Sequence, residues 1–311
     1  MLAQFLLRNG KVINRLNSAK AHGYLPTQIV AIEKPAINNH SRSKLKSHLY
    51  ITSDYKRNCA GGLRTKGLFK SSFPDKPLIS VITVVLNGEK HLEETIKSVI
   101  NQTYENVEYI IMDGGSTDCT LEIIKKYENQ IDYWVSKNDN GIYDAMNKAT
   151  TLINGDWCCF VGSDDYLLDC LYTVKNYLVN KQCVYYGDVI LSSSGDIYGG
   201  VFNPYKLMMK NIPHQAILYP RAVFEKYCYS ALYPYLADYC LNLMLYADKD
   251  FIFQHINIVY AFYNNTGRSS SVVDVEFNKD KSRIINKYYG YKYKIPYFAA
   301  KIIKQILSKT R

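Results

Sequence analysis

A chain of 311 residues, 47% hydrophobic and 21% charged, can build one large domain or two modest ones around a hydrophobic core, which excludes wholesale disorder, collagen and a coiled coil. Its formal charge of +10 is uneven: residues 1–75 hold 13 Lys+Arg against 3 Asp+Glu, residues 281–311 hold 9 against none, and the middle holds 16 against 25. An acidic middle argues against a nucleic-acid partner, while basic ends favour contact with an anionic surface.

Residues 1–76 read as a basic N-terminal extension without a clear structural pattern. The segment ends in a turn-rich linker at 71–77. Its apolar patch at residues 2–7 is interrupted by Gln4 and is too short for a secretory signal, and no run in the chain reaches the roughly 18 apolar residues of a membrane span. Eight cysteines without a C-x-x-C pair favour reduced, buried thiols over zinc or disulfides. We therefore expect a cytoplasmic protein.

From Leu78 onward, apolar runs and helical patterns alternate. Residues 78–86 form a β-branched apolar run, typical of a strand buried on both faces of a parallel sheet. Further strands are expected at 107–112, 131–135, 157–161 and 184–191, and helices near 92–100, 121–127, 142–153 and 169–178. Strands joined through helices need crossover connections. The pattern predicts an α/β fold with a mainly parallel, doubly wound sheet flanked by helices.

Polar residues follow each of the first four expected strands. They are Asn87-Gly88-Glu89, Asp113 to Asp118, Asp139-Asn140-Gly141 and Gly162-Ser163-Asp164-Asp165. Ligands of open α/β sheets bind outside the carboxyl ends of the strands, so these loops should share one crevice. Ser116 has a second interpretation, as an N-cap of the helix that follows, and the residues alone do not decide between the two.

Asp164 and Asp165 carry the sharpest chemical signal. Two adjacent carboxylates after a buried strand repel each other unless a cation or a sugar hydroxyl offsets the cost. Mg²⁺ or Mn²⁺ bound by one or two carboxylates and by phosphate oxygens would suit a nucleoside diphosphate. The sequence has neither a G-x-x-x-x-G-K-[ST] loop nor a G-x-G-x-x-G after the first strand, which disfavours kinases, ATPases and dinucleotide oxidoreductases.

Together these motifs resemble the inverting family 2 glycosyltransferases. The matching segments are LISVITVVLN at 78–87, SVINQTYENVEYIIMDGGSTD at 98–118, NDNGIYDAMNKA at 138–149, NGDW at 154–157 and VGSDD at 161–165. The resemblance implies a GT-A-type, Rossmann-like domain over residues 77–270, with a nucleotide-binding half at 77–169, an acceptor half at 170–270 and a basic helical region at 271–311. It also implies a nucleoside-diphosphate-sugar donor, with a UDP-sugar expected first, and a bound Mn²⁺ or Mg²⁺.

By position, the resemblance assigns roles to individual residues of the nucleotide-binding half. Asp165 corresponds to the metal-binding carboxylate, and the nucleotide or donor contacts are Val84, Asn87, Asp113, Ser116, Asp144, Lys148 and Asp164. The commoner family pattern is Asp-Asp-Gly-Ser-x-Asp, so the second carboxylate, which usually reads the uracil edge, is Gly114 here. The base is therefore undetermined. Asp144 and Lys148 are also spaced as a helical ion pair, and that interpretation stays equally open.

In the acceptor half, the resemblance points to four residues. His214 and Gln215 would lie near the donor sugar or the acceptor, although a histidine can equally be a packed core residue. Arg268, in the loop 264–271, would reach the diphosphate or stay solvated. Asp238 begins an amphipathic helix, where an aspartate is by default a cap; in similar enzymes it is the catalytic base, which takes the proton of the acceptor hydroxyl.

The resemblance thus implies transfer of a sugar to a glycan or a lipid-linked glycan in surface polysaccharide biosynthesis. Two alternatives stay open, a sugar-phosphate nucleotidyltransferase and a non-catalytic glycan-binding protein on the same fold. Near the C-terminus, residues 295–306 place apolar side chains on one stripe of a helix and basic ones opposite. Such a helix would lie on the inner face of an anionic membrane or pack on the domain.

Overall fold

The computed structural model describes residues 29–30, 59–267 and 272–290. The expectations for most of the N-terminal extension, for Arg268 and for the amphipathic helix at 295–306 lie outside these residues.

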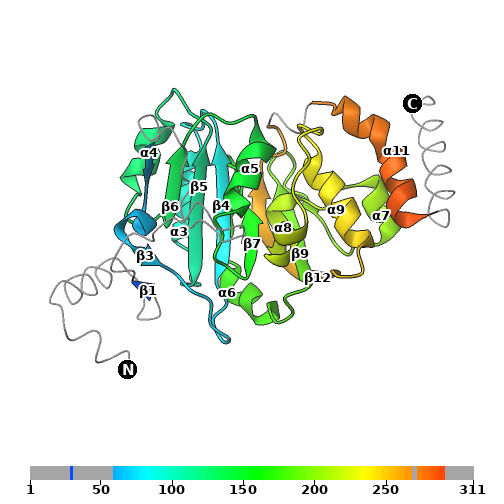
Figure 1. Ribbon diagram of the computed structural model, residues 1–311, viewed down its shortest axis with the longest axis horizontal. Coiled ribbons are helices and arrows are strands. Elements are labelled where there is room, and N and C mark those ends of the chain that lie inside the picture. Colours follow the sequence, from blue (N-terminus) through cyan, green and yellow to red (C-terminus); the bar gives the residue numbers. More distant parts are fainter. Residues whose placement is uncertain (1–28, 31–58, 268–271, 291–311) are drawn as a thin grey trace, which may run out of the picture.

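Four parallel strands form the half of the sheet at residues 77–169 that we expect to bind the nucleotide, as the sequence pattern predicts. They are β4 (Ile79–Val85), β5 (Val107–Asp113), β6 (Tyr133–Ser136) and β7 (Trp157–Phe160), arranged in the order β6-β5-β4-β7. The crossovers contain α3 (Leu92–Ile100), α4 (Thr120–Lys126) and α5 (Ile142–Thr150). Figure 1 shows these strands side by side in one half of the molecule, with α5 in front of them.

The sheet is covered on both faces because its central strands are apolar on both sides. Along β4, Ile82 joins one hydrophobic cluster with residues of α5, whereas Val81 joins a second cluster with residues of α3. Successive side chains of a strand point to opposite faces, so an unbroken apolar strand requires a helix on each side. Burying each such side chain contributes about 1.5–3 kcal/mol. This is the doubly wound α/β arrangement expected from the sequence.

Beyond β7 the sheet continues as a mixed sheet. The added strands are β11 (Ile217–Pro220), β9 (Cys183–Leu191), β12 (Ile252–Tyr263), β8 (Tyr166–Leu167) and β10 (Ile197–Tyr198). β9 and β12 pair in parallel, whereas β11 pairs antiparallel with β7 and with β9. The expected helix at 169–178 is split into α6 (Leu171–Val174) and η2 (Lys175–Tyr177).

The remaining described helices after β7 pack beside this extension. They are α7 (Pro204–Met209), η3 (His214–Ala216), α8 (Ala222–Lys226), α9 (Ala237–Ala247) and α11 (Val275–Tyr289). Helices α7, α9 and α11 gather at the end of the molecule opposite β6 (Figure 1). Asp274 caps α11 by accepting a hydrogen bond from the Phe277 amide at 3.0 Å. The second carboxylate oxygen of Asp274 accepts from the amides of Tyr235 and Leu236, so this cap also ties α11 to the start of α9.

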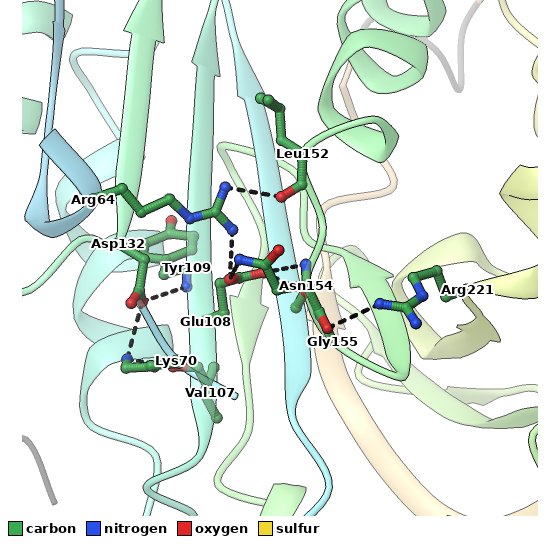
Figure 2. A network of polar contacts seen from close by, with 11 residues as sticks. Arg64, Lys70, Val107, Glu108, Tyr109, Asp132, Leu152, Asn154, Gly155 and Arg221 are labelled. Carbon is green, nitrogen blue, oxygen red and sulfur yellow. Dashed lines mark hydrogen bonds and ion pairs between the residues drawn. The ribbon is translucent and has the colours of Figure 1, made fainter. Parts of the chain in front are cut away.

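The packed sheet begins earlier in the chain than residue 77, where the sequence placed the start of the domain. β2 (Cys59–Gly61) pairs antiparallel with β6, and η1 (Leu63–Lys66) follows it directly. β1 (Ile29–Val30) pairs with β3 (Leu68–Phe69) in a small separate sheet. Figure 2 shows the buried Arg64 reaching Glu108 on β5. A buried arginine needs a buried partner, and this partner lies 44 positions away in the sequence.

Two further observations concern membranes and thiols. Among the described helices, none combines the length and the apolar character that crossing a bilayer requires. All eight cysteines lie in the described part of the chain, and no disulfide joins them. Cys158 and Cys159 are buried in β7, whereas Cys59, Cys119 and Cys228 are exposed.

Candidate active site

The order of the strands reverses at β4, which is where the candidate residues converge. β5 and β6 lie on one side of β4 and β7 lies on the other. Asn87 follows β4, and Asp164 and Asp165 follow β7. The crevice outside the carboxyl ends of such strands is the usual ligand site of open α/β sheets.

Asn87 and Ser116 join the first two loops of this edge. The Asn87 amide donates to Ser116 Oγ at 2.7 Å, and Asn87 Oδ1 accepts from the Thr117 amide at 2.9 Å. Asn87 has a φ of 54°, a left-handed conformation that asparagine tolerates better than most residues. The N-cap of α4 is Cys119, so Ser116 does not cap that helix. Of its two interpretations, the N-cap is wrong; Ser116 instead holds the two loops in register.

Asp113 shapes the second loop from within. It is buried, and its carboxylate accepts hydrogen bonds from Ser116 Oγ and Ser136 Oγ, both at 2.5 Å, and from the Gly115 amide at 3.2 Å. A carboxylate with this many donors is a rigid support for the loop. Asp113 also contributes to the wall of the neighbouring pocket.

This pocket lies beside the ends of β5 and β6, next to α5. It is lined by Met112, Asp113, Val135, Lys137, Asp139, Ala145 and Lys148. Lys148 also forms an ion pair with Asp144 at 2.6 Å, so the helical ion pair is present, and its contact with the nucleotide stays a prediction. Asp144 is not among the residues that line the pocket. Burial would raise the pKa of Asp144, but hydrogen bonds from Lys148 and from the Asn140 amide outweigh burial and lower this pKa. Val84 is buried in β4 and does not line this pocket.

Asp165 is held by three donors at the end of β7. Its Oδ1 accepts from the Asn264 amide at 2.8 Å, and its Oδ2 accepts from Gln215 Nε2 at 2.9 Å and from the Gly162 amide at 3.1 Å. Only 4% of the residue is exposed. Burial raises the pKa of Asp165, and the neighbouring Asp164 adds to the rise, while the hydrogen bonds from Asn264 and Gln215 oppose it.

Asp164 is exposed beside it and accepts a hydrogen bond from Asn264 Nδ2 at 2.9 Å. Within the described ranges, no three His, Cys, Asp or Glu side chains converge as a ready-made metal cluster. Mg²⁺ and Mn²⁺ need only one or two carboxylates when phosphates and water complete their shell. A carboxylate has about four acceptor positions, and Asp165 uses three of them. The carboxylate oxygens of Asp164 and Asp165 therefore fit the coordination of a divalent cation that binds together with a diphosphate.

His214 and Gln215 lie in η3, between the two groups of carboxylates. Gln215 is buried and contacts Asp165, as described above. His214 is partly exposed, and its Nδ1 lies 3.8 Å from Asp238 Oδ2. The histidine is therefore not a packed core residue, and it contacts the carboxylate expected to be the base.

Asp238 lies in the first turn of α9 and is held in a buried polar network. Tyr143 donates its hydroxyl to Asp238 Oδ1 at 2.7 Å, and Asn211 Nδ2 donates to Asp238 Oδ2 at 2.7 Å. Asn242 supports Asn211 by a further hydrogen bond of 2.9 Å. The default interpretation, a helix cap, is wrong: the N-cap position is Leu236 and has no side-chain capping bond.

Two adjacent residues of η3 link the carboxylates: Gln215 Nε2 donates to Asp165 Oδ2 at 2.9 Å, and His214 Nδ1 lies 3.8 Å from Asp238 Oδ2. Burial raises the pKa of Tyr263 to about 12, and Asp165, Asp238 and Asp164 each add to the rise by their negative charge. The structure thus brings Asp164, Asp165 and Asp238 around one centre, although Asp238 is more than 70 positions away in sequence.

Sequence reasoning missed four residues of this site: Tyr143, Asn211, Tyr263 and Asn264. Tyr143 lies within the NDNGIYDAMNKA segment and Asn211 lies three positions before His214, so proximity to a motif was the available signal. Asn264 was noted only as part of a loop. Its contact with Asp165 spans 99 positions, and no local pattern reveals such a pairing.

Comparison with known proteins gives a consistent picture. A model of the family described as Glycosyl transferase family 2 matches residues 80–233. A PGL/p-HBAD biosynthesis glycosyltransferase of Mycobacterium bovis (strain BCG / Pasteur 1173P2) is 35% identical over 213 residues, which cover 65% of this chain and 83% of that protein. A protein of the same name from Mycobacterium tuberculosis (strain ATCC 25177 / H37Ra) matches to the same extent.

Among solved structures, the chain is similar to TarS of S. aureus. The crystal structure of TarS 1-349 in complex with UDP has a TM-score of 0.55 and 18% identity, and the match covers 68% of this chain and 65% of that one. The complex with UDP-GlcNAc gives a TM-score of 0.53 and 19% identity with the same coverage. The chain thus spans just under two thirds of TarS 1-349, and a similarity at this identity shows a shared fold.

Proposed function

The chain belongs to glycosyl transferase family 2 and is a glycosyltransferase, and from that premise we propose that it is inverting and metal-dependent. Its donor is a nucleoside-diphosphate sugar, with a UDP-sugar as the first candidate. Its acceptor is a hydroxyl of a glycan or a lipid-linked glycan in the synthesis of a surface polysaccharide or glycolipid. The similar mycobacterial proteins are named for PGL/p-HBAD biosynthesis, and TarS was crystallised with UDP and with UDP-GlcNAc, which supports both assignments.

One observation carries the proposal: the hydrogen-bonded carboxylate Asp238 is linked to the carboxylate pair Asp164 and Asp165 through the adjacent residues His214 and Gln215. Asp238 comes from α9 in the acceptor half, whereas the pair follows β7 at the nucleotide edge. A base on the acceptor side and carboxylates on the diphosphate side are the arrangement that an in-line displacement requires.

In the proposed reaction, Asp238 accepts the proton of the acceptor hydroxyl as that oxygen attacks the anomeric carbon. Tyr143 and Asn211 each donate to one carboxylate oxygen, which orients Asp238 before the substrate binds. His214, 3.8 Å from Asp238, is placed to contact the acceptor or the donor sugar. Attack from the side opposite the diphosphate inverts the configuration at the anomeric carbon.

Asp165, with Asp164 beside it, would hold Mn²⁺ or Mg²⁺ together with the diphosphate. When bound, the cation supplies positive charge that stabilises the departing diphosphate. Gln215 and the Asn264 amide keep the Asp165 carboxylate in place for this role. Neutralising Asp165 should therefore impair departure of the diphosphate, whereas neutralising Asp238 should impair proton transfer from the acceptor hydroxyl.

The test measures donor hydrolysis and transfer with Mn²⁺ present, for the wild type and for Asp238→Asn and Asp165→Ala. Loss of a general base or of a charge-stabilising group lowers the rate by about 10²- to 10⁴-fold. Glu105→Gln is the matched control, because Glu105 is an exposed partner of Lys76. Unchanged turnover in a folded Asp238→Asn or Asp165→Ala protein would refute the role given to that residue. A wild type that binds glycans but turns over no nucleotide sugar would favour the non-catalytic alternative.

We also propose that the enzyme works in the cytoplasm at the inner face of the cell membrane. The proposal rests on the basic, amphipathic pattern of residues 295–306, where a lipid-linked acceptor would be within reach.

A further inference from the structure

Gly114 leaves a space at the end of β5 that another part of the chain fills. A Cβ atom added to Gly114 would lie 2.7 Å from Asp139 Oδ2 and 3.2 Å from Asp139 Cγ. The carboxyl group of Asp139, from the loop after β6, thus occupies the volume that a side chain at residue 114 would need. Its position is fixed by a hydrogen bond of 2.8 Å from the Gly141 amide to its other oxygen, Oδ1.

The pocket next to Asp139 combines apolar walls with charged side chains. Met112, Val135 and Ala145 supply apolar walls, and the polar lining residues are two aspartates and two lysines. Apolar walls with a few placed polar groups are typical of small-molecule sites. Burial raises the pKa of Asp139, while the Gly141 amide and Lys148 act against the rise. A partly desolvated carboxylate of this kind is stabilised when a ligand N–H donates to it.

We propose that Asp139 selects the nucleobase of the donor, accepting a hydrogen bond from a ring N–H that has a carbonyl group beside it. Uracil offers such an N–H at N3 and guanine at N1, and the carbonyl oxygens can accept from Lys137 or Lys148. Cytosine and adenine present a bare ring nitrogen at the matching position, whose lone pair would face the carboxylate. The inference rests on the proposed function, since it names the base of that donor.

The consequence for specificity follows from hydrogen-bond chemistry alone. A carboxylate only accepts, so it discriminates against a ring nitrogen that also only accepts. An asparagine at residue 139 would have one acceptor and one donor. It could accept from the cytosine amino group and donate to N3 of that ring. Asp139→Asn should therefore shift the preference from UDP or GDP toward CDP.

The experiment measures binding of UDP, GDP, CDP and ADP by calorimetry, with the full chain and a constant Mn²⁺ concentration. We expect the wild type to prefer UDP or GDP over CDP and ADP. In Asp139→Asn, the ratio of the preferred base to CDP should fall by about 10- to 100-fold, the effect of one hydrogen bond to a charged group. Whether UDP or GDP binds more tightly identifies the base.

Two further variants make the result specific. Gly114→Asp combined with Asp139→Gly returns a carboxylate to the same space from the β5 side, and should restore the wild-type preference. Asp250→Asn makes the same chemical change at an exposed partner of Lys226, and should leave the ratio unchanged. Because the readout is a ratio of affinities in one preparation, a partly unfolded sample does not alter it.

The outcomes separate this inference from the function it rests on. A wild type that binds UDP or GDP, but with the same base ratio in Asp139→Asn, would overturn the role of Asp139 and leave the proposed function standing. A wild-type preference for CDP or ADP would do the same. If the wild type binds none of the four nucleotides, the proposed donor is wrong and the inference fails with it.

Discussion

Replacing Arg64 with methionine should strongly destabilise the domain, although Arg64 precedes residues 77–270, the range predicted for the domain from the sequence. Arg64 and Glu108 form an ion pair in which the side chains are 1% and 0% exposed. Arg64 Nη1 also donates to the Leu152 carbonyl at 2.8 Å, and Glu108 accepts from Ser80 Oγ at 2.6 Å and from Asn154. Figure 2 shows how this network joins the N-terminal segment to β5 and to the loop before β7.

The magnitude follows from the burial of the partner. Removing one member of a buried pair leaves an uncompensated charge and costs about 3–5 kcal/mol. Total stabilities are about 5–15 kcal/mol, and in a domain of this size each kcal/mol shifts Tm by about 2–4 °C. Arg64→Met should therefore lower Tm by roughly 6 to 20 °C. The free energy of unfolding, measured by urea denaturation with circular dichroism, gives the value directly.

The destabilisation should also depend on pH. Burial would raise the pKa of Glu108, but Arg64 and the hydrogen bonds from Asn154 and Ser80 outweigh it, so the folded-state pKa is lowered. A carboxylate with a lowered folded-state pKa stabilises the protein above its unfolded value of about 4.3, and this contribution is lost as the pH falls through the folded-state pKa. In Arg64→Met the unpaired Glu108 can take a proton instead. The difference between variant and wild type should therefore shrink at acidic pH.

Lys70→Met is the comparison variant, because Lys70 pairs with Asp132 at 2.9 Å but is 12% exposed. Burial raises the pKa of Asp132, so this carboxylate protonates more readily once its partner is lost, and the cost should be smaller. Combining Arg64→Met with Glu108→Gln should recover part of the stability, since no buried charge remains. An Arg64→Met protein within about 1 kcal/mol of the wild type at pH 7, less than the pair predicts, would refute the reasoning.

Two further predictions concern catalysis and membrane contact. Tyr143→Phe removes the 2.7 Å hydrogen bond that orients Asp238, so kcat should fall about tenfold, the effect of one hydrogen bond to a charged group; an unchanged kcat would show that Tyr143 only packs. The full chain should bind anionic vesicles in a salt-sensitive manner, whereas a chain ending at Gly290 should not, and equal binding by both would argue that residues 291–311 do not contact the membrane.

Much of the nucleotide-binding half follows from local pattern. The run at 78–86 and the strands near 107, 131 and 157 appear in the structure within about two residues, because an apolar, β-branched segment between turn signals has few alternatives to a buried strand. Asn87, Asp164 and Asp165 could be placed at one edge for the same reason, since parallel strands bring their carboxyl ends together.

The sequence by itself therefore determined which segments are buried, which loops share an edge and which carboxylates lie there. Only the tertiary structure decided their partners: Gln215 on Asp165, Tyr143 on Asp238, Asp139 in the space beside Gly114, and Arg64 on Glu108. Periodicity along the chain reports the burial of a segment, which is a local property. These hydrogen bonds and this ion pair join residues 44 to 95 positions apart, and their geometry depends on how separate elements pack together.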